Sequence, residues 1–169
     1  MLMTAAQWNM RLENEYKAMC AFPVNSLFSW KIADNQTTPR VKAYLVTYRV
    51  KTMVKVNGRL KAQNETQVLI TLPDSPSGTP TAKIVSGQIP YHPNIYTNGN
   101  FCIGNIWSTE PILWKFVINL GKVLAFDPAH TAPGDAANRD AAADWNRKQA
   151  RPVKPYPCGS INFPHPVGY

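Results

Sequence analysis

The chain has 169 residues, of which 44% are hydrophobic and 17% charged, and its formal net charge is +8. This is the composition of a globular protein with one sizeable core, and it excludes disordered and fibrous classes. Fifteen prolines disfavour an all-helical fold, and the positive charge suggests an acidic partner or a nucleic acid.

The first predicted element is a helix over residues 4–20. Its apolar positions recur at steps of three and four residues and therefore share one face: Trp8, Leu12, Tyr16 and Met19. Thr4 is suited to cap the helix, and Pro23 ends the segment.

Residues 27–30 are read as either a short strand or a buried anchor before a polar loop, and two longer strands follow. Residues 41–56 alternate, with apolar or small residues on one face and basic residues on the other, which predicts a half-buried strand. Asn57-Gly58 is a strong hairpin signal, because both residues accept a positive φ. We therefore expect an antiparallel return strand over residues 59–72.

The second half of the chain begins with a turn at 73–80 and a strand at 82–85. Residues 89–111 show no period, and a loop of that length inside a compact domain is usually functional. Apolar spacing then predicts an amphipathic helix over 112–126 and a last helix over 138–148.

In the last helix, Asn138 is the expected cap and Trp145 the expected anchor. The segment 151–169 holds five prolines, so we expect an extended tail after a domain at 1–150. Together the elements predict an α+β fold: an N-terminal helix, an antiparallel meander sheet, a long active-site loop, two further helices and a proline-rich tail.

The three cysteines, Cys20, Cys102 and Cys158, are an odd number without close spacing. This disfavours a disulfide framework and indicates a reducing compartment, so we expect a cytoplasmic protein. The start of the chain lacks the pattern of a secretory signal, and the apolar stretch 112–126 is interrupted by polar residues, so no membrane association is expected. Because the cysteines and histidines lack paired ligand spacing, neither a metal site nor a cofactor is predicted.

Cys102 lies in the polar, turn-rich part of the long loop, and Asn94 precedes it by eight residues. A thiol beside an amide donor is a nucleophile beside a candidate oxyanion stabiliser. The first hypothesis is therefore acyl transfer through a thioester on Cys102. A Cys-His hydrolase with His92, His130 or His165 as its base is an alternative, although no local protease signature surrounds Cys102.

The stretch from Leu69 to Trp145 resembles the core of ubiquitin-conjugating enzymes. Five features match in order: Thr71-Leu72-Pro73, the motif His92-Pro93-Asn94, Cys102 ten residues after the histidine, Trp107-Ser108, and Asp127-Pro128 followed by Asn138-Arg139-Asp140-Ala141-Ala142. The resemblance implies that Cys102 accepts the C-terminal acyl group of a ubiquitin-like protein from an activating enzyme. The acyl group would then pass to an amine, typically a lysine of a protein substrate, with or without a ligase.

By the same resemblance, Asn94 donates to the oxyanion, or alternatively only braces the loop, and His92 gives structural support. The match departs from the family on the acceptor side. Gly104 stands where many members have an acidic residue, and Thr131 and Ala132 stand at the gate after the second helix. These departures suggest a divergent member, bacterial and acting in antiviral defence, whose ubiquitin-like protein need not be ubiquitin itself.

An incoming lysine amine must lose a proton before it attacks. The acidic or basic side chains that could accept this proton are Asp127, His130 and Asp135.

Two other functions stay open from the sequence. One is a non-catalytic module that binds a ubiquitin-like protein, although such variants typically lack the cysteine. The other is nucleic-acid binding through the basic run between residues 40 and 61, which is disfavoured because few aromatics accompany the charges. We instead expect this basic face and the first helix to dock acidic partners, through Arg49, Lys51, Trp8 and Arg11.

Overall fold

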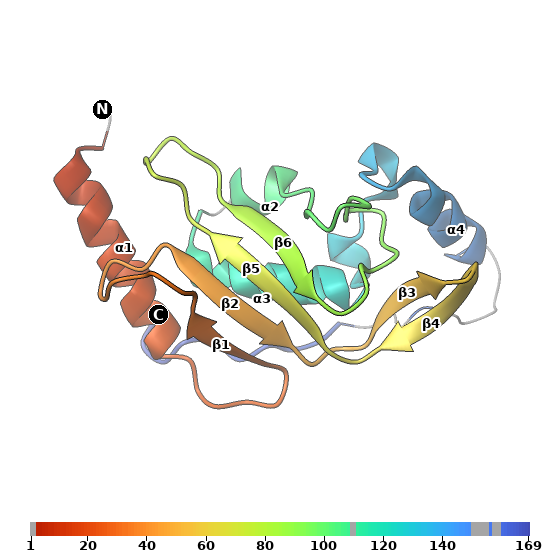
Figure 1. Cartoon of the computed structure of the whole chain (residues 1–169), viewed down its shortest axis with the longest axis horizontal. Helices are drawn as coiled ribbons and strands as arrows, with labels where there is room; N and C mark the ends of the chain where they lie inside the picture. Colours follow the sequence, from red (N-terminus) through yellow and green to blue (C-terminus); the bar gives the residue numbers. More distant parts are fainter. Residues whose placement is uncertain (1–2, 109–110, 150–155, 157–159) are drawn as a thin grey trace.

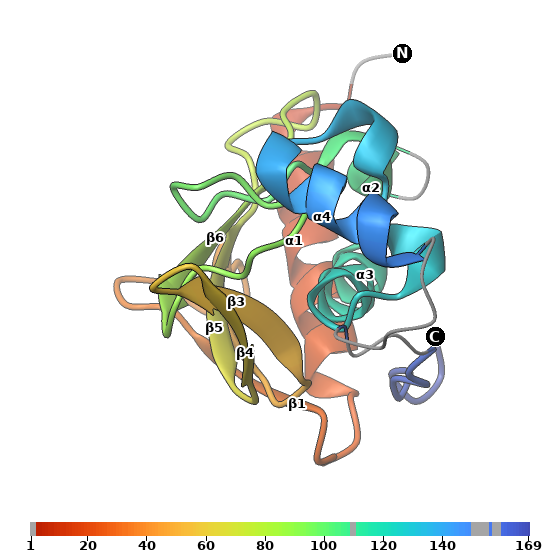
Figure 2. The ribbon, with the colours of Figure 1, turned by 90° about the vertical axis from the view of Figure 1, so that its right-hand side faces the viewer.

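The computed structural model describes residues 3–108, 111–149, 156 and 160–169. Figure 1 shows α1 (Ala5–Cys20) at one end of the molecule and α4 (Arg139–Gln149) at the other, with the sheet between them. Turned by 90°, the same chain shows two layers, with the strands on one side and α1, α3 (Leu113–Leu124) and α4 on the other (Figure 2). The predicted α+β class is confirmed.

The N-terminal helix forms as predicted. Thr4 and Gln7 make a reciprocal capping box, in which each side chain accepts a hydrogen bond from the backbone N–H of the other residue. Leu12 and Met19 are buried in the main core, and Glu15, also buried, accepts a hydrogen bond from the backbone N–H of Leu113 at 2.9 Å. This carboxylate caps α3 from a neighbouring helix, because Ile112 at the N-cap position has no side-chain oxygen.

A four-stranded antiparallel sheet, in the order β1-β2-β5-β6, forms the other layer. Its strands are β1 (Phe28–Ile32), β2 (Ala43–Tyr48), β5 (Thr66–Thr71) and β6 (Thr81–Ser86). Val46 pairs with Val68 at the centre, and alternate residues on the face toward the helices are buried. This alternation is what the period-two pattern of the sequence predicts.

The long central hairpin is not continuous, and this part of the prediction is wrong. Its outer half is a separate two-stranded ribbon, β3 (Thr52–Val56) and β4 (Arg59–Gln63), joined by Asn57-Gly58, whose φ angles are +49° and +73°. Three successive residues at the start of β3 are buried, which a strand with one buried face cannot achieve: Thr52, Met53 and Val54. Met53 packs in a second apolar cluster with Phe126, Trp145 and Tyr156, and this packing draws the ribbon toward α4.

The long loop contains one element that the sequence did not predict. A short helix, α2 (Gly104–Ser108), begins two residues after Cys102. The amphipathic helix α3 is confirmed, and its core positions include Phe116, Val117 and Leu120. Two single 3-10 turns, η1 (Pro128–His130) and η2 (Pro133–Asp135), lead to α4, where the Asn138 side chain caps the helix as predicted by accepting from the N–H of Ala141 at 3.0 Å.

The described part of the tail crosses back over the core. Phe163 is buried against Phe28 and lies directly over Gly121 of α3, and the N–H of Val167 donates to the carbonyl of Ala21 at 2.9 Å. No helix among the described residues is long and apolar enough to span a membrane.

Candidate active site

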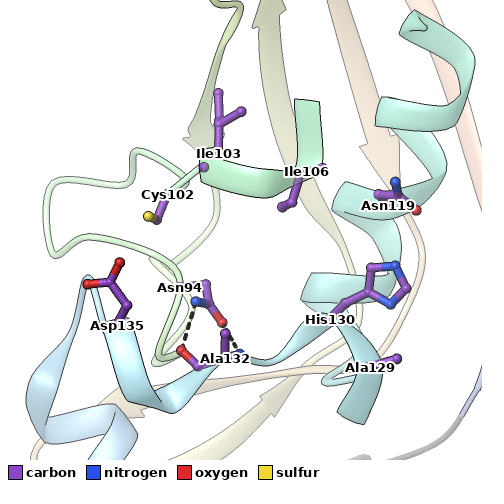
Figure 3. Close-up of a pocket in the computed structure, with 10 residues that line it drawn as sticks. Asn94, Cys102, Ile103, Ile106, Asn119, Ala129, His130, Ala132 and Asp135 are labelled. Carbon is purple, nitrogen blue, oxygen red and sulfur yellow. Dashed lines mark hydrogen bonds between the residues drawn. The ribbon is translucent and has the colours of Figure 1, made fainter. Parts of the chain in front are cut away.

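Cys102 lies at the rim of a cleft of about 420 Å³. Its backbone N–H donates to the carbonyl of Asn94 at 2.9 Å, so the backbone at these two positions of the long loop is held side by side. Figure 3 shows the thiol and the other side chains that line the cleft: Asn94, Ile103, Ile106, Asn119, Ala129, His130, Ala132 and Asp135. The thiol is partly exposed, as a nucleophile that must meet a large substrate requires.

The side chain of Asn94 forms two hydrogen bonds with the backbone of one residue. Its Nδ2 donates to the carbonyl of Ala132 at 3.1 Å, and its Oδ1 accepts from the N–H of Ala132 at 2.8 Å (Figure 3). The amide therefore clamps the loop after α3 to the loop that carries Cys102. An amide nitrogen has two protons, so one N–H of Asn94 remains beyond the bond to Ala132.

His92 supports the same loop from inside the core. Its Nδ1 accepts a hydrogen bond from the backbone N–H of Asn94 at 2.9 Å, and its ring packs on Phe126 at 4.4 Å between centroids. Burial lowers the pKa of His92 to about 3, although a hydrogen bond with the backbone of Val123 acts in the opposite direction. The imidazole is therefore neutral and already occupied, which disfavours a role as base for Cys102.

Tyr96, which the sequence did not single out, is 43% exposed and lies beside the thiol. A hydrogen bond with Cys102, the charge of Cys102, burial and the charge of Asp135 raise the pKa of Tyr96, in that order of size. The phenol therefore lies close to the thiol. One feature of the sequence could have identified this residue: a tyrosine stands two residues after Asn94, in the loop that carries Cys102.

The three candidate proton acceptors occupy different positions. Asp127 is 5% exposed, and its Oδ1 accepts from the N–H of Ala129 at 2.9 Å, so it caps η1. His130 has its Nδ1 at 3.5 Å from Asp127 Oδ1 and lies across the cleft from Cys102, near Asn119 (Figure 3). Asp135 is exposed and is the one carboxylate among the described residues that line the cleft.

Thr131 and Ala132, which align with the family's gate, differ in exposure. Thr131 is buried and its hydroxyl donates to the carbonyl of Asp127 at 2.9 Å, whereas Ala132 is exposed and held by Asn94. Neither side chain can accept a proton from an amine in the cleft.

The predicted docking surface is wrong in one residue. Trp8 is 5% exposed and belongs to the core, because its ring lies on the face of α1 that packs inward. The Arg11 guanidinium lies over the rings of Trp8 and Trp107, pairs with Glu15 at 3.5 Å and donates to the carbonyl of Pro111. The guanidinium is therefore engaged in contacts within the chain.

The basic run is partly neutralised within the chain. Four of its members lie near carboxylates: Arg40 at 2.9 Å from Glu13, Lys42 at 2.8 Å from Asp74, Arg49 at 3.7 Å from Glu65 and Lys55 at 3.8 Å from Asp144. Lys51 is exposed on the bend between β2 and β3, which Figure 1 places away from α1.

The described residues contain no group of three or more histidine, cysteine, aspartate or glutamate side chains that could hold a metal ion.

Comparison with known proteins finds likeness in structure and none in sequence. No protein-family model matches the chain, and no curated protein matches it. A solved structure described as a novel ubiquitin-conjugating enzyme is similar with a TM-score of 0.55 and 16% identity, over 86% of this chain and 88% of that one. The ubiquitin-conjugating-enzyme domain of a Toxoplasma gondii protein is similar with a TM-score of 0.54 and 18% identity, over 83% of this chain and 88% of that one.

A ubiquitin-conjugating enzyme E2 from Plasmodium falciparum gives a TM-score of 0.50 and 18% identity, over 69% of this chain and 96% of that one. The likeness is one of fold, and it extends over most of both chains. The polypeptide therefore has the fold of the ubiquitin-conjugating enzymes.

Proposed function

We propose that this protein is a conjugating enzyme that carries the C-terminal acyl group of a ubiquitin-like protein as a thioester on Cys102 and passes it to an amine. The observation that supports this most directly is the lining of the cleft: a partly exposed thiol, Cys102, with Asn94 and one carboxylate among the described lining residues, Asp135. The fold shared with ubiquitin-conjugating enzymes makes an activating enzyme and a protein substrate the expected partners, with or without a ligase.

Loading is an exchange of one thioester for another. The sulfur of Cys102 attacks the carbonyl carbon of the acyl group on the activating enzyme's cysteine, the tetrahedral intermediate collapses, and that enzyme's thiolate leaves. No net oxidation or hydrolysis occurs, so the acyl group stays activated. The remaining N–H of Asn94 is the side-chain donor available to the oxyanion, since the other holds Ala132.

Transfer needs a neutral amine. The amine nitrogen attacks the Cys102 thioester, the sulfur leaves as thiolate, and the nitrogen gives up one proton as the amide forms. We assign that proton to Asp135, the carboxylate that lines the cleft, and the orientation of the amine to Tyr96, which contacts the thiol. In this proposal Asp135 and Tyr96 together activate the amine, a role that an acidic residue at position 104 or 132 would otherwise have.

A hydrolytic enzyme is disfavoured by the same geometry. A cysteine hydrolase needs an imidazole that bonds to its thiol and later activates water. His92 is buried and accepts from Asn94, and His130 lies on the far side of the cleft. A thiol that has neither His92 nor His130 beside it is better suited to carry a long-lived thioester than to catalyse hydrolysis.

The test is a loading assay with ATP and a panel of ubiquitin-like proteins, each with its own activating enzyme. We expect at least one to form an adduct that a reducing agent removes, that Cys102→Ala abolishes, and that Cys20→Ala, a change at another exposed cysteine, leaves intact. Binding of a ubiquitin-like protein without any such adduct would instead identify a non-catalytic binding module.

A further inference from the structure

One cluster joins three elements that are distant in sequence. The hydroxyl of Tyr91 donates to Asp144 Oδ2 at 2.9 Å, and the ammonium of Lys55 donates to the same hydroxyl at 3.3 Å. Lys55 also lies 3.8 Å from Asp144 and 4.5 Å from the centre of the Tyr91 ring. Lys55 comes from β3, Tyr91 from the start of the Cys102 loop and Asp144 from α4.

The charges of this cluster favour a persistent contact. Burial and the hydrogen bond with Asp144 raise the pKa of Tyr91 to about 12, so its hydroxyl stays protonated at neutral pH. Burial acts to raise the pKa of Asp144, but hydrogen bonds from Arg147 and Tyr91 and the charges of Arg147 and Lys55 outweigh it. A neutral donor therefore faces an ionised acceptor, and such bonds are stronger than those between two neutral groups.

The cluster lies on the path that places Asp135. The turn η2, which ends at Asp135, is separated from α4 by three residues, and the N–H of the last of these, Asn138, donates to the carbonyl of Pro93 at 3.0 Å. The start of α4 is thus tied to the Cys102 loop at Pro93, and its middle is tied to the same loop at Tyr91. Any shift of α4 along this loop moves Asp135 relative to the thiol.

We propose that Tyr91, held by Lys55 and Asp144, is a positioning residue for acyl transfer to the amine, and that it acts by fixing Asp135 at its distance from Cys102. This inference rests on the proposed function, because it assigns Tyr91 to the acceptor half of that reaction. The positioning role does not extend to the loading of Cys102, because the backbone of Cys102 is held by its own hydrogen bond to the carbonyl of Asn94.

Tyr91→Phe removes the hydroxyl without removing the support of α4. Trp145 still anchors the helix, because its ring is buried and stacks on Phe126 at 5.6 Å between centroids. The control is Tyr16→Phe, a change of the same atoms on α1, where the hydroxyl contacts Cys20. For Lys55→Met the matched control is Lys31→Met, a change at an exposed lysine of β1 that forms no ion pair among the described residues.

The experiment measures loading of Cys102 and then single-turnover discharge to free lysine as a function of lysine concentration. For Tyr91→Phe and Lys55→Met we expect loading within twofold of the wild type and a maximal discharge rate about tenfold lower, since a small misplacement of a reacting group has effects of this size. The lysine concentration at half-maximal rate should stay the same. Both controls should behave as the wild type.

A double-mutant cycle decides whether Tyr91 acts through Asp135. If it does, Tyr91→Phe combined with Asp135→Ala discharges no more slowly than Asp135→Ala alone. Multiplicative losses, or an unaffected Tyr91→Phe, would overturn the proposal. A separate readout is hydrogen exchange at the Asn138 amide, which should accelerate in Tyr91→Phe and not in Tyr16→Phe.

The exchange experiment does not depend on conjugation. If the wild-type protein never forms a thioester, the proposed function fails, whatever the exchange rates. If it forms one and the Asn138 amide exchanges at the wild-type rate in Tyr91→Phe, the positioning role fails and the proposed function stands.

Discussion

Asn94 and Ala132 are joined by a pair of hydrogen bonds in which the side-chain amide of one residue meets the backbone N–H and carbonyl of the other, at 2.8 and 3.1 Å. The residue that the sequence assigns to the oxyanion therefore also holds the loop with Asp135 beside Cys102. Loading and transfer in the proposed reaction therefore both depend on the side chain of Asn94. Its role as oxyanion donor and its role as clamp can be separated only by measuring the reaction rate and the free energy of unfolding of the same variant.

Asn94→Ala should lower the free energy of unfolding by about 1–3 kcal/mol, because two partly buried backbone groups lose their partner. Urea unfolding measures this loss. Discharge to lysine should slow more than loading, since the loop that carries Asp135 is released. A variant that unfolds like the wild type would show that the clamp contributes little, and Asn119→Ala, an amide removed from the far side of the same cleft, is the matched control.

The buried His92 makes stability depend on pH. Burial lowers its pKa to about 3 in the folded chain, whereas an unfolded histidine titrates near 6.5. The stabilisation is therefore fully present above the unfolded pKa and is lost as the pH falls from there toward the folded value. His92→Asn keeps an acceptor for the N–H of Asn94 but cannot take up the proton.

We expect the stability advantage of the wild type over His92→Asn to shrink by about 2 kcal/mol between pH 7 and pH 5. Urea unfolding at the two pH values measures it. An advantage that does not change with pH would mean that the folded protein binds a proton at His92 as readily as the unfolded chain.

Glu15 should make stability depend on pH with the opposite sign to His92. Burial raises its pKa, although the N–H of Leu113 and the Arg11 charge act against this. The folded chain then binds the proton more readily than the unfolded chain, so this contribution is present at low pH and is lost as the pH rises through the folded pKa. Relative to Glu15→Gln, which keeps an acceptor for Leu113, the wild type should gain stability as the pH falls from 7 toward 5.

Thermal unfolding of the two proteins across this range is the measurement. A difference that is constant with pH would contradict the raised pKa. Glu15→Ala removes the acceptor altogether and should cost about 1–3 kcal/mol at any pH, because the Leu113 N–H at the start of α3 is left buried and unpaired.

The tail should contribute to stability through one close contact. A Cβ added at Gly121 would lie 2.5 Å from the Phe163 ring and 3.0 Å from the Tyr48 ring. Although alanine normally favours a helix over glycine by about 1 kcal/mol, Gly121→Ala should destabilise the protein by about 1–3 kcal/mol through overpacking.

Chemical denaturation compares this variant with Gly134→Ala, where nothing lies within 4 Å of the added carbon. Adding Phe163→Ala to Gly121→Ala should cost less than Phe163→Ala costs alone, because the methyl then fills space that the ring has left. Strictly additive losses would show that Phe163 and Gly121 do not meet in solution.

The sequence was sufficient for the elements whose signal is local. The N-cap at Thr4, the positive φ of Asn57-Gly58 and the cap at Asn138 were all predicted because each depends on neighbouring residues. The order of elements around Cys102 followed from the same kind of pattern.

What the sequence missed depends on contacts between distant segments. The break of the hairpin arises from packing of Met53 against Trp145. Tyr96 belongs to the site because the loop returns its ring to Cys102, and the link from Tyr91 to α4 requires a helix that begins almost fifty residues later. No periodicity or motif contains this information.

The most direct test of the account is the mass of the intact protein after incubation with ATP, the activating enzyme and the ubiquitin-like protein that gives an adduct. The account predicts one added acyl group, equal in mass to the ubiquitin-like protein less one water, located on Cys102, lost on reduction, and converted in Cys102→Ser to an ester that resists reduction. An adduct that persists in Cys102→Ala, or that maps to another residue, would contradict it.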